Sequence, residues 1–439
     1  DTDSAEEYIL AGSNVGGWLG LLTYAATLFS TFTLMGMPDF FRNHGIGAWI
    51  FLAVSDGAQV FFIVWFGYHL RKKAQARGFR GTAGLISSLY DTAWAGYLYF
   101  IGVFLFLIPY AAIQVRGLAV FLEAVFPGAL PAWVWSAGIV AIMLIYSEVG
   151  GFRAIMYSDA LQGLTLLIVT WVIAVGCIKS FGGVGAMFDT VQNANSELLS
   201  IPGPQGLFSR QFLIASFFAV LLLPATQPHL TTRLMAIRDR ATMNRMAVSI
   251  GCFAILIILP VIAIGMFGSV HLADATAREF WAEVLLFGPS DFIGAAAVIG
   301  LLTAAMSTAD AQIFALGTEL RSLMDEGRAH IMRWTRIAIG FFGVAVLIFS
   351  IVSSDQLALL ARVSFAGTAL LAPMILAGVL GEDVPGPEVP IATGFGLAIF
   401  LLSLLGAVPE MVAGVRMDLG LLVLLAVWTG GSYLLRRSG

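Results

Sequence analysis

The sequence predicts an all-α protein that crosses a membrane about twelve times, each crossing needing about 20 apolar residues. Of its 439 residues, 59% are hydrophobic and 11% are charged, whereas an ordinary soluble domain carries about 25% charged residues. A chain this poor in charge cannot cover its surface with solvated groups, so most of its perimeter must face lipid. The composition therefore excludes a soluble enzyme.

The apolar runs follow one another along the chain with short polar connections. They occupy 11–37, 46–70, 92–125, 131–149, 154–179, 208–232, 246–270, 292–323, 331–353, 356–380, 389–408 and 416–435. Basic residues concentrate at 71–81, at Arg233 and at 238–245, which places these segments on the cytoplasmic side. We predict a single transmembrane domain over 1–439.

Charge and cysteine content exclude further classes of protein. The formal net charge of -4 provides no basic surface for nucleic acid. Cys177 and Cys252 lie in apolar stretches without metal-type spacing, so the sequence predicts neither a disulfide framework nor a metal cluster. The connections also lack a nucleophile, base and metal constellation, so we expect no enzyme.

Two of the apolar runs contain residues that interrupt a helix. The first reads AATLFSTFTLMGMP, with Gly-Met-Pro as its exit, and the sixth reads LLLPATQPHLTTR, with Pro224 and Pro228. Interrupted helices at corresponding places in two halves are typical of an inverted-repeat transporter with its site at the midplane. Prolines that only kink lipid-packed helices would give the same pattern, so spacing alone leaves both interpretations open.

A family resemblance rests on five motifs in order. They are YILAGSNVGGW at 8–18, ATLFSTFTLMGMP at 26–38, YSEVGGFRAIMYSDALQ at 146–162, QPHLTTRLMAIRD at 227–239 and AAMSTADAQ at 304–312. The chain resembles the sodium:solute symporter family, which includes the sodium/proline, sodium/pantothenate and sodium/glucose cotransporters. The resemblance implies a leucine-transporter-like fold, with inverted five-helix repeats over 11–181 and 208–380 and two additional helices over 389–435. Members usually carry one more helix ahead of the YILAG stretch, so it also implies a missing N-terminal helix.

The resemblance implies a sodium-coupled symporter that imports a small organic solute by alternating access, in the inner membrane of a bacterium. A hard cation such as sodium is held by carbonyl, hydroxyl and carboxylate oxygens. By resemblance, the sodium ligands map onto the carbonyls of Ala26, Phe29 and Ala304 and the hydroxyls of Ser307 and Thr308. The alternative is that Ser307 and Thr308 only bond back to the preceding helical turn.

Carboxylates inside the membrane are costly and need a reason. Asp159 and Asp310 form the second candidate site, because some family members hold a second sodium between corresponding positions. Two carboxylates in one cavity would bind a cation together or share a proton. We therefore expect a second cation or proton site, or a step on the inward release path. The alternative is that Asp159 is a structural polar group near the inner face.

Polar residues near the expected pocket are the candidates for binding the solute: Ser30, Thr31, Thr33, Ser55, Asp56, Gln59, Gln114 and Gln227. The positions that line the sugar site in sugar-carrying relatives are apolar here, at Leu52, Val220 and Leu223, which disfavours a sugar. A monocarboxylate or a small amino acid would suit this set. Asp56 would then receive an amino group, or it is a buried carboxyl at a helix contact.

Two alternatives to a sodium symporter are a transporter-like sensory module of a signalling protein and a proton-coupled carrier of the same fold. The expected partners are the solute, the sodium ion and the lipid bilayer, with no nucleic acid. The sequence leaves open a homodimer or a small membrane subunit.

Overall fold

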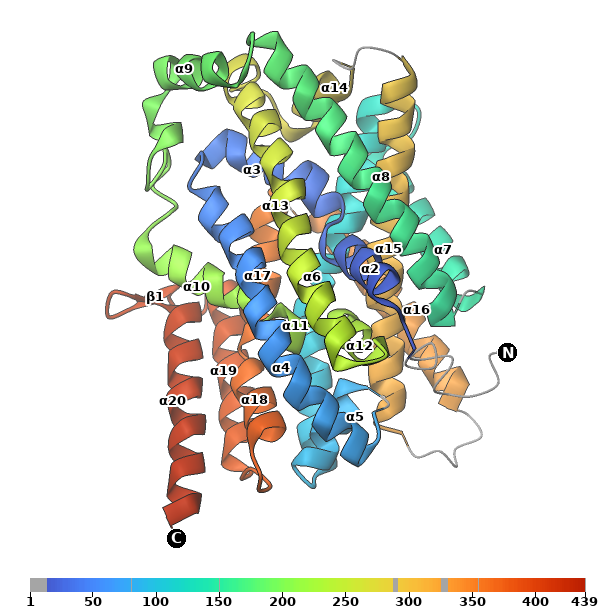
Figure 1. Ribbon diagram of the computed structural model, residues 1–439, viewed down its shortest axis with the longest axis vertical. Helices are drawn as coiled ribbons and strands as arrows, with labels where there is room; N and C mark the ends of the chain where they lie inside the picture. The colour runs from blue at the N-terminus through green and yellow to red at the C-terminus, as the bar shows by residue number, and fades with distance from the viewer. Residues whose placement is uncertain are drawn as a thin grey trace.

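The computed structural model describes residues 14–438 except 80, 150, 287–290, 325–330 and 354. The side chains of some helical residues also lie outside the described part, among them Ala304, Ser307 and Asp310. The described chain is mainly helical and carries one short antiparallel hairpin near its C-terminal end (Figure 1).

In chain order the helices are α2 (Gly17–Leu28), η2 (Phe32–Gly36), α3 (Met37–His44), η3 (Ile50–Val54), α4 (Ser55–Arg77), α5 (Thr82–Leu89), α6 (Ala93–Val125), α7 (Ala132–Val149), α8 (Gly151–Ser180), α9 (Val184–Ala194), η4 (Ser196–Leu199), α10 (Arg210–Leu221), α11 (Leu223–Thr226), α12 (Pro228–Ala236), α13 (Arg240–His271), α14 (Ala277–Leu286), α15 (Asp291–Ser322), α16 (Ile331–Val352), α17 (Leu357–Ala369), α18 (Ala372–Leu380), α19 (Glu388–Leu404) and α20 (Met417–Ser438). The hairpin consists of β1 (Met411–Val412) and β2 (Val415–Arg416) and lies just before α20.

Each predicted apolar run coincides with helical structure in the described residues. Among these residues, 5 helices are long and apolar enough to cross a membrane, or up to 7 spans if each of two bent helix pairs counts as one. Other apolar helices, such as α10 and α19, are shorter. The number of crossings beyond this stays a prediction.

The first run is broken in its middle, as predicted, but its exit differs from the prediction. Helix α2 ends at Leu28, Phe29 has an extended backbone, and the chain continues through η2 into α3 at an angle of 54°. The Gly-Met-Pro segment does not end the helix, because Pro38 stands at the start of α3, which runs on to His44. Met37 donates its amide to the Phe32 carbonyl of η2, so the helical path runs on through this segment.

The sixth run is also broken. Pro224 and Pro228 each stand in the first turn of a short helix, α11 and α12, and Gln227 between these helices is extended. A further break, absent from the sequence prediction, separates α17 from α18 with a bend of 41°. By contrast, Pro109 and Pro260 lie inside the continuous helices α6 and α13. Proline content alone therefore does not locate the breaks.

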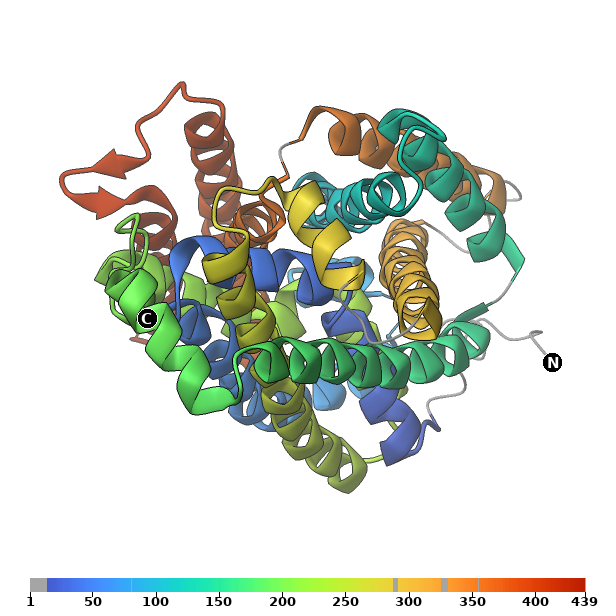
Figure 2. The same cartoon turned by 90° about the horizontal axis from the view of Figure 1, so that it is seen from above.

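The broken segments lie in the interior of the bundle. Helix α13 packs against α2, α3, α4 and α8, and α15 packs against α2, α6, α8 and α12. In the view from above, the blue segments that carry the first break lie inside, whereas the red hairpin and α20 lie at the periphery (Figure 2). Large apolar side chains such as Phe61, Leu161 and Phe395 are exposed. This arrangement suits a protein whose outer surface contacts lipid.

Candidate functional site

The break in α2 releases two backbone carbonyls from the helical hydrogen-bond ladder. In a regular helix the amides of Ser30 and Thr33 would donate to the carbonyls of Ala26 and Phe29. Here the Ser30 amide donates to the Thr33 hydroxyl (3.1 Å), and the Thr33 amide donates to the Ser30 carbonyl (2.9 Å). The Ala26 and Phe29 carbonyls are thereby left available to a ligand.

Helix α15 brings a hydroxyl to one of these carbonyls. The Thr308 hydroxyl is fully buried and donates to the Ala26 carbonyl over 3.3 Å. Two of the predicted sodium ligands, Ala26 and Thr308, are therefore in contact although 282 residues separate them. Ala304 and Ser307 belong to the same helix, but their side chains lie outside the described residues.

Asp159 forms a buried ion pair one helical turn from this contact. Its carboxylate lies 2.5 Å from the Arg233 guanidinium and accepts a hydrogen bond from the Thr23 hydroxyl at 2.6 Å. Arg233 also donates to Thr23 (3.0 Å) and to the His229 carbonyl (2.9 Å). The basic segments predict that Arg233 lies at the inner side, but its side chain is buried in the bundle with only 1% exposure.

This pair was not predicted from the sequence. Arg233 stands at the end of the sixth apolar run, next to a basic loop, and was therefore expected at the inner side. The signal that could have found it is the cost of an uncompensated buried carboxylate, which calls for a cation nearby. The second member of the predicted acidic site, Asp310, has its side chain outside the described residues, so the pairing of Asp159 with Asp310 stays a prediction.

All eight predicted solute-binding residues are buried, with at most 4% exposure. Three of them bond to backbone near the helix irregularities: Ser30 and Thr33 accept amides of the first break, and Ser55 donates to the Ile50 carbonyl (3.0 Å). Asp56 accepts a hydrogen bond from Gln59 at 2.9 Å within α4, so both interpretations of Asp56 stay predictions.

The remaining candidates carry unsatisfied hydrogen-bonding atoms. The Thr31 hydroxyl and the side-chain oxygens of Gln59, Gln114 and Gln227 are buried without a hydrogen-bond partner in the described part of the chain. The amide nitrogen of Gln227 is engaged, since it donates to the Thr368 hydroxyl (3.1 Å). Buried polar atoms are nearly always paired in proteins, so unpaired atoms around a helix break indicate a ligand site.

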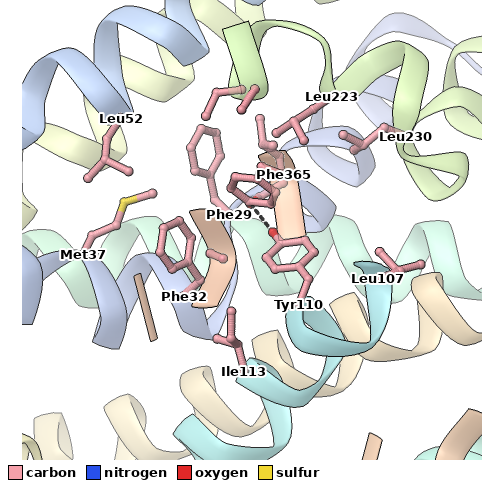
Figure 3. Close-up of a cluster of buried hydrophobic side chains, with 14 of the residues drawn as sticks. Phe29, Phe32, Met37, Leu52, Leu107, Tyr110, Ile113, Leu223, Leu230 and Phe365 are labelled. Atoms are coloured by element: carbon pink, nitrogen blue, oxygen red, sulfur yellow. Dashed lines mark hydrogen bonds between the residues drawn. The ribbon is translucent and has the colours of Figure 1, made fainter. Parts of the chain in front are cut away.

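An aromatic and aliphatic cluster lies at the first break and includes Phe29, Phe32, Tyr110 and Phe365 (Figure 3). The rings of Tyr110 and Phe365 pack edge to face with their centroids 4.9 Å apart. The rings of Phe32 and Phe365 also pack edge to face, with a centroid distance of 6.3 Å. Leu52 and Leu223, two of the positions that disfavour a sugar, lie in the same cluster. The third, Val220, is also buried. The environment is therefore mostly apolar with a few polar groups, which is typical of a small-molecule site.

A further ion pair lies at the end of the bundle that the basic residues predict to be the outer one. Arg116 forms an ion pair with Asp355 at 2.7 Å, which joins α6 to the segment before α17. Leu357 lines two outer cavities of about 140 and 10 Å³. A side chain on Gly117 would meet Thr31, Leu357 and Met35, so α6 packs tightly against the first break here.

The sequence is similar to a family model and to individual proteins of known function. The model of the sodium:solute symporter family matches residues 8–381. A sodium/pantothenate symporter of Haemophilus influenzae is 27% identical over 63% of this chain and 55% of its own length. A sodium/proline symporter of Escherichia coli is 22% identical over 86% of this chain and 78% of its own. The chain spans about half the length of the pantothenate relatives that it matches.

A solved structure of a Na⁺-coupled sialic acid symporter, in a substrate-bound outward-open state, matches with a TM-score of 0.78. The alignment covers 99% of this chain and 92% of that chain at 14% identity, so the likeness shows the fold. The family and these relatives are transporters rather than enzymes. Since the family model covers most of the sequence, the chain belongs to the sodium:solute symporter family.

Proposed function

We propose that this protein is a sodium-coupled secondary symporter that imports a small organic solute by alternating access across a bacterial inner membrane. The observation that carries the proposal is the contact of the Thr308 hydroxyl with the freed Ala26 carbonyl. Sodium would bind to the carbonyls of Ala26, Phe29 and Ala304 and to the hydroxyls of Ser307 and Thr308. Bound there, it would join α2 to α15 and so couple ion binding to the packing of the two helices.

The solute would be a monocarboxylate or a small amino acid. The side-chain oxygens of Gln59, Gln114 and Gln227 are unpaired hydrogen-bond acceptors. They would accept hydrogen bonds from a solute, which favours a solute with N–H or O–H donors. Asp56 lies beside Gln59 and would receive an amino group. The apolar walls at Leu52 and Leu223 would pack against the body of the solute, because hydroxyl groups placed against them would lose their hydrogen bonds.

We infer further that 11–181 and 208–380 form two inverted repeats with their broken helices around this site. The support is the occurrence of a break in the first helix of each segment, at Phe29 and at Gln227.

Asp159 and Asp310 would form a second cation or proton site. In this site the Arg233 guanidinium would compete with the bound cation for the Asp159 carboxylate. Loss of cation dependence in uptake by Asp310→Asn would support this site, and unchanged ion stoichiometry and affinity would contradict it.

The experiment that tests the function is the thermal stability of the purified chain against sodium concentration, with potassium at equal ionic strength as control. Binding to the folded state stabilises it by about 2.7 kcal/mol at one hundred times the dissociation constant. We expect a sodium-specific rise in Tm that Ser307→Ala/Thr308→Ala abolishes. The matched control is Thr318→Ala, which removes a buried hydroxyl of α15 that bonds only to the Phe314 carbonyl among the described contacts.

A sodium-specific rise would justify testing sodium-driven uptake of monocarboxylates and small amino acids in liposomes. If the wild type responds to sodium and potassium alike, the sodium site is wrong and proton coupling takes its place. If Thr318→Ala abolishes the response as fully as the double variant, the effect of the double variant is a general loss of packing in α15.

A further inference from the structure

Gln312 carries a fully buried side-chain amide that belongs to neither the sodium site nor the solute site proposed above. It lies in α15 with 0% exposure, and neither its side-chain nitrogen nor its side-chain oxygen has a hydrogen-bond partner in the described part of the chain. An amide buried in this way destabilises the fold, because it loses its bonds to water and gains none in return. A leucine or methionine would fill the same space without that cost. The presence of glutamine therefore calls for a functional reason.

The position of Gln312 follows from the geometry of α15. It is four residues after Thr308, so it lies on the same face, about 6 Å further along the helix axis. Glu319 lies on this face as well, since eleven residues complete just over three turns beyond Thr308. All three side chains are buried. They form a polar stripe along the second half of α15, interrupted by the buried Ala315 between Gln312 and Glu319.

The stripe leads from the candidate sodium site to the inner end of the bundle. The Glu319 carboxylate accepts hydrogen bonds from the first amides of α5, at Thr82 (2.9 Å) and Ala83 (2.5 Å). Helix α5 follows the basic segment 71–81 and lies at the end of the bundle opposite α9 and α14 (Figure 1). Thr308 thus marks the middle of the molecule and Glu319 its cytoplasmic end.

Helix α2 runs in the opposite direction beside this stripe. Its start is fixed at the inner end, because Val15 pairs with Ile237 and Arg71 donates to the Ile237 carbonyl. Since Ala26 contacts Thr308, the residues one turn earlier in α2 lie at the depth of Gln312. Thr23 is one of these residues, and it belongs to the Asp159–Arg233 ion pair. Gln312 therefore lies one turn inside the sodium position, at the depth of this polar network.

We propose that the side-chain oxygen of Gln312 is a transit ligand for sodium on its way from the Thr308 position to the cytoplasm. The inference rests on the proposed function. An amide oxygen is a good ligand for a hard cation. A single such ligand, supplemented by water, holds the ion weakly, and weak sites in series let an ion leave without a steep barrier. The unpaired amide of the closed state is the group that the ion meets when it leaves Thr308.

The test compares Gln312→Leu and Gln312→Met with the wild type in two measurements on the full chain. The first is the sodium-dependent rise in Tm, and the second is the maximal rate of sodium-driven uptake in liposomes. We expect both variants to have a basal Tm equal to or above that of the wild type, because an unpaired buried amide has been removed. We expect the sodium concentration for half-maximal stabilisation to stay the same. The maximal uptake rate should fall about tenfold, the loss expected from one polar contact in the crossing step.

Gln312→Glu tests the opposite change, in which the ligand at this position binds sodium more strongly. A carboxylate at this position should hold sodium more tightly, so that uptake again slows while the sodium-induced rise in Tm grows. Thr318→Val serves as control, because Thr318 is buried on α15 but lies off the stripe. It should leave the uptake rate unchanged.

The outcomes are distinguishable. If the wild type shows no sodium-specific stabilisation, the proposed function fails and the transit ligand fails with it. If the wild type responds and Gln312→Leu raises Tm without slowing uptake, the amide is only an unpaired structural group and the inference is wrong. If Gln312→Leu removes the sodium response itself, Gln312 belongs to the main ion site, which also overturns a separate transit position.

Discussion

The side chains of Asp159 and Arg233 form an ion pair with 0% and 1% exposure inside the bundle. Two charges taken out of water stabilise each other only with good geometry and further hydrogen bonds. Here Thr23 contacts both members, and the His229 carbonyl accepts a further guanidinium proton. The network joins α2, α8 and α12 beside the candidate ion site.

Removal of either charge should therefore destabilise the fold strongly. We predict that Arg233→Met lowers the free energy of unfolding by about 3–5 kcal/mol, because Asp159 is left as an uncompensated buried charge. Asp159→Asn combined with Arg233→Met should recover most of this loss, since no charge then remains. The measurement is thermal or denaturant unfolding of the four proteins of the double-mutant cycle. Equal destabilisation by the single and double variants would contradict the prediction.

At the residue scale, the candidate solute-binding hydroxyls and amides fall into two groups, those that bond to backbone and those that keep an unpaired atom. Ser30, Thr33 and Ser55 satisfy backbone groups, whereas Thr31, Gln59, Gln114 and Gln227 keep an unpaired atom. All of these residues can be chosen from the sequence by their polarity in apolar runs. Their division cannot, because it depends on which neighbouring groups the breaks in the helices bring within hydrogen-bond distance.

At the scale of elements, close packing of α17 against α6 lies next to the bend between α17 and α18. Gly367 of α17 lies directly against the Phe106 ring of α6, so that a side chain there would overlap the ring. The neighbouring Ser364 hydroxyl donates to the Phe106 carbonyl. These contacts hold α17 close to α6, and two residues after Gly367 α17 ends at its bend with α18.

We predict that Gly367→Ala destabilises the fold by about 1–3 kcal/mol, since the added methyl group forces the packed helices apart. Gly340 of α16 is the matched control, because no atom lies within 4 Å of a side chain built there. Gly340→Ala should be neutral or stabilise by up to about 1 kcal/mol through its better helix propensity. Both values follow from unfolding midpoints. Equal effects at the two glycines would show that α6 and α17 adjust freely.

At the scale of the whole molecule, an ion pair joins α6 to the segment before α17 at the end of the bundle that the basic residues predict to be the outer face. The Arg116–Asp355 ion pair and Leu357 lie at this face, while Asp56 and the glutamines are buried below it. Alternating access requires this face to open, and opening would separate α6 from the segment before α17. A contact made only in the closed state biases the population towards that state.

We predict that Arg116→Gln raises the apparent affinity for external sodium by up to about fivefold, the equivalent of the roughly 1 kcal/mol that a partly exposed ion pair contributes. The maximal uptake rate should not rise, because the closed state must still form in each cycle. Arg77→Gln is the control, since its exposed pair with Asp91 lies at the inner end. The measurement is the sodium dependence of uptake in liposomes. A lower sodium affinity in Arg116→Gln would assign Arg116 to the stabilisation of the open state.

The sequence by itself determined the class of protein, the order of its apolar helices, and the family through its motifs. These properties are local: hydrophobic runs, prolines and short motifs can be recognised without knowing their neighbours in space. It also indicated that the first and sixth runs are interrupted, and the resemblance named Ala26 and Thr308 as ligands of one ion. The places of the breaks, at Phe29 and at Gln227, come from the structure.

The tertiary structure alone decided which distant residues meet. It paired Asp159 with Arg233, seated Glu319 at the start of α5, bent α17 against α18 and left Gln312 unpaired beneath Thr308. Each of these facts depends on the depth and rotation at which two helices pack. Helix packing is set by the fit of many side chains at once, and the hydrophobic pattern of a single segment does not specify it.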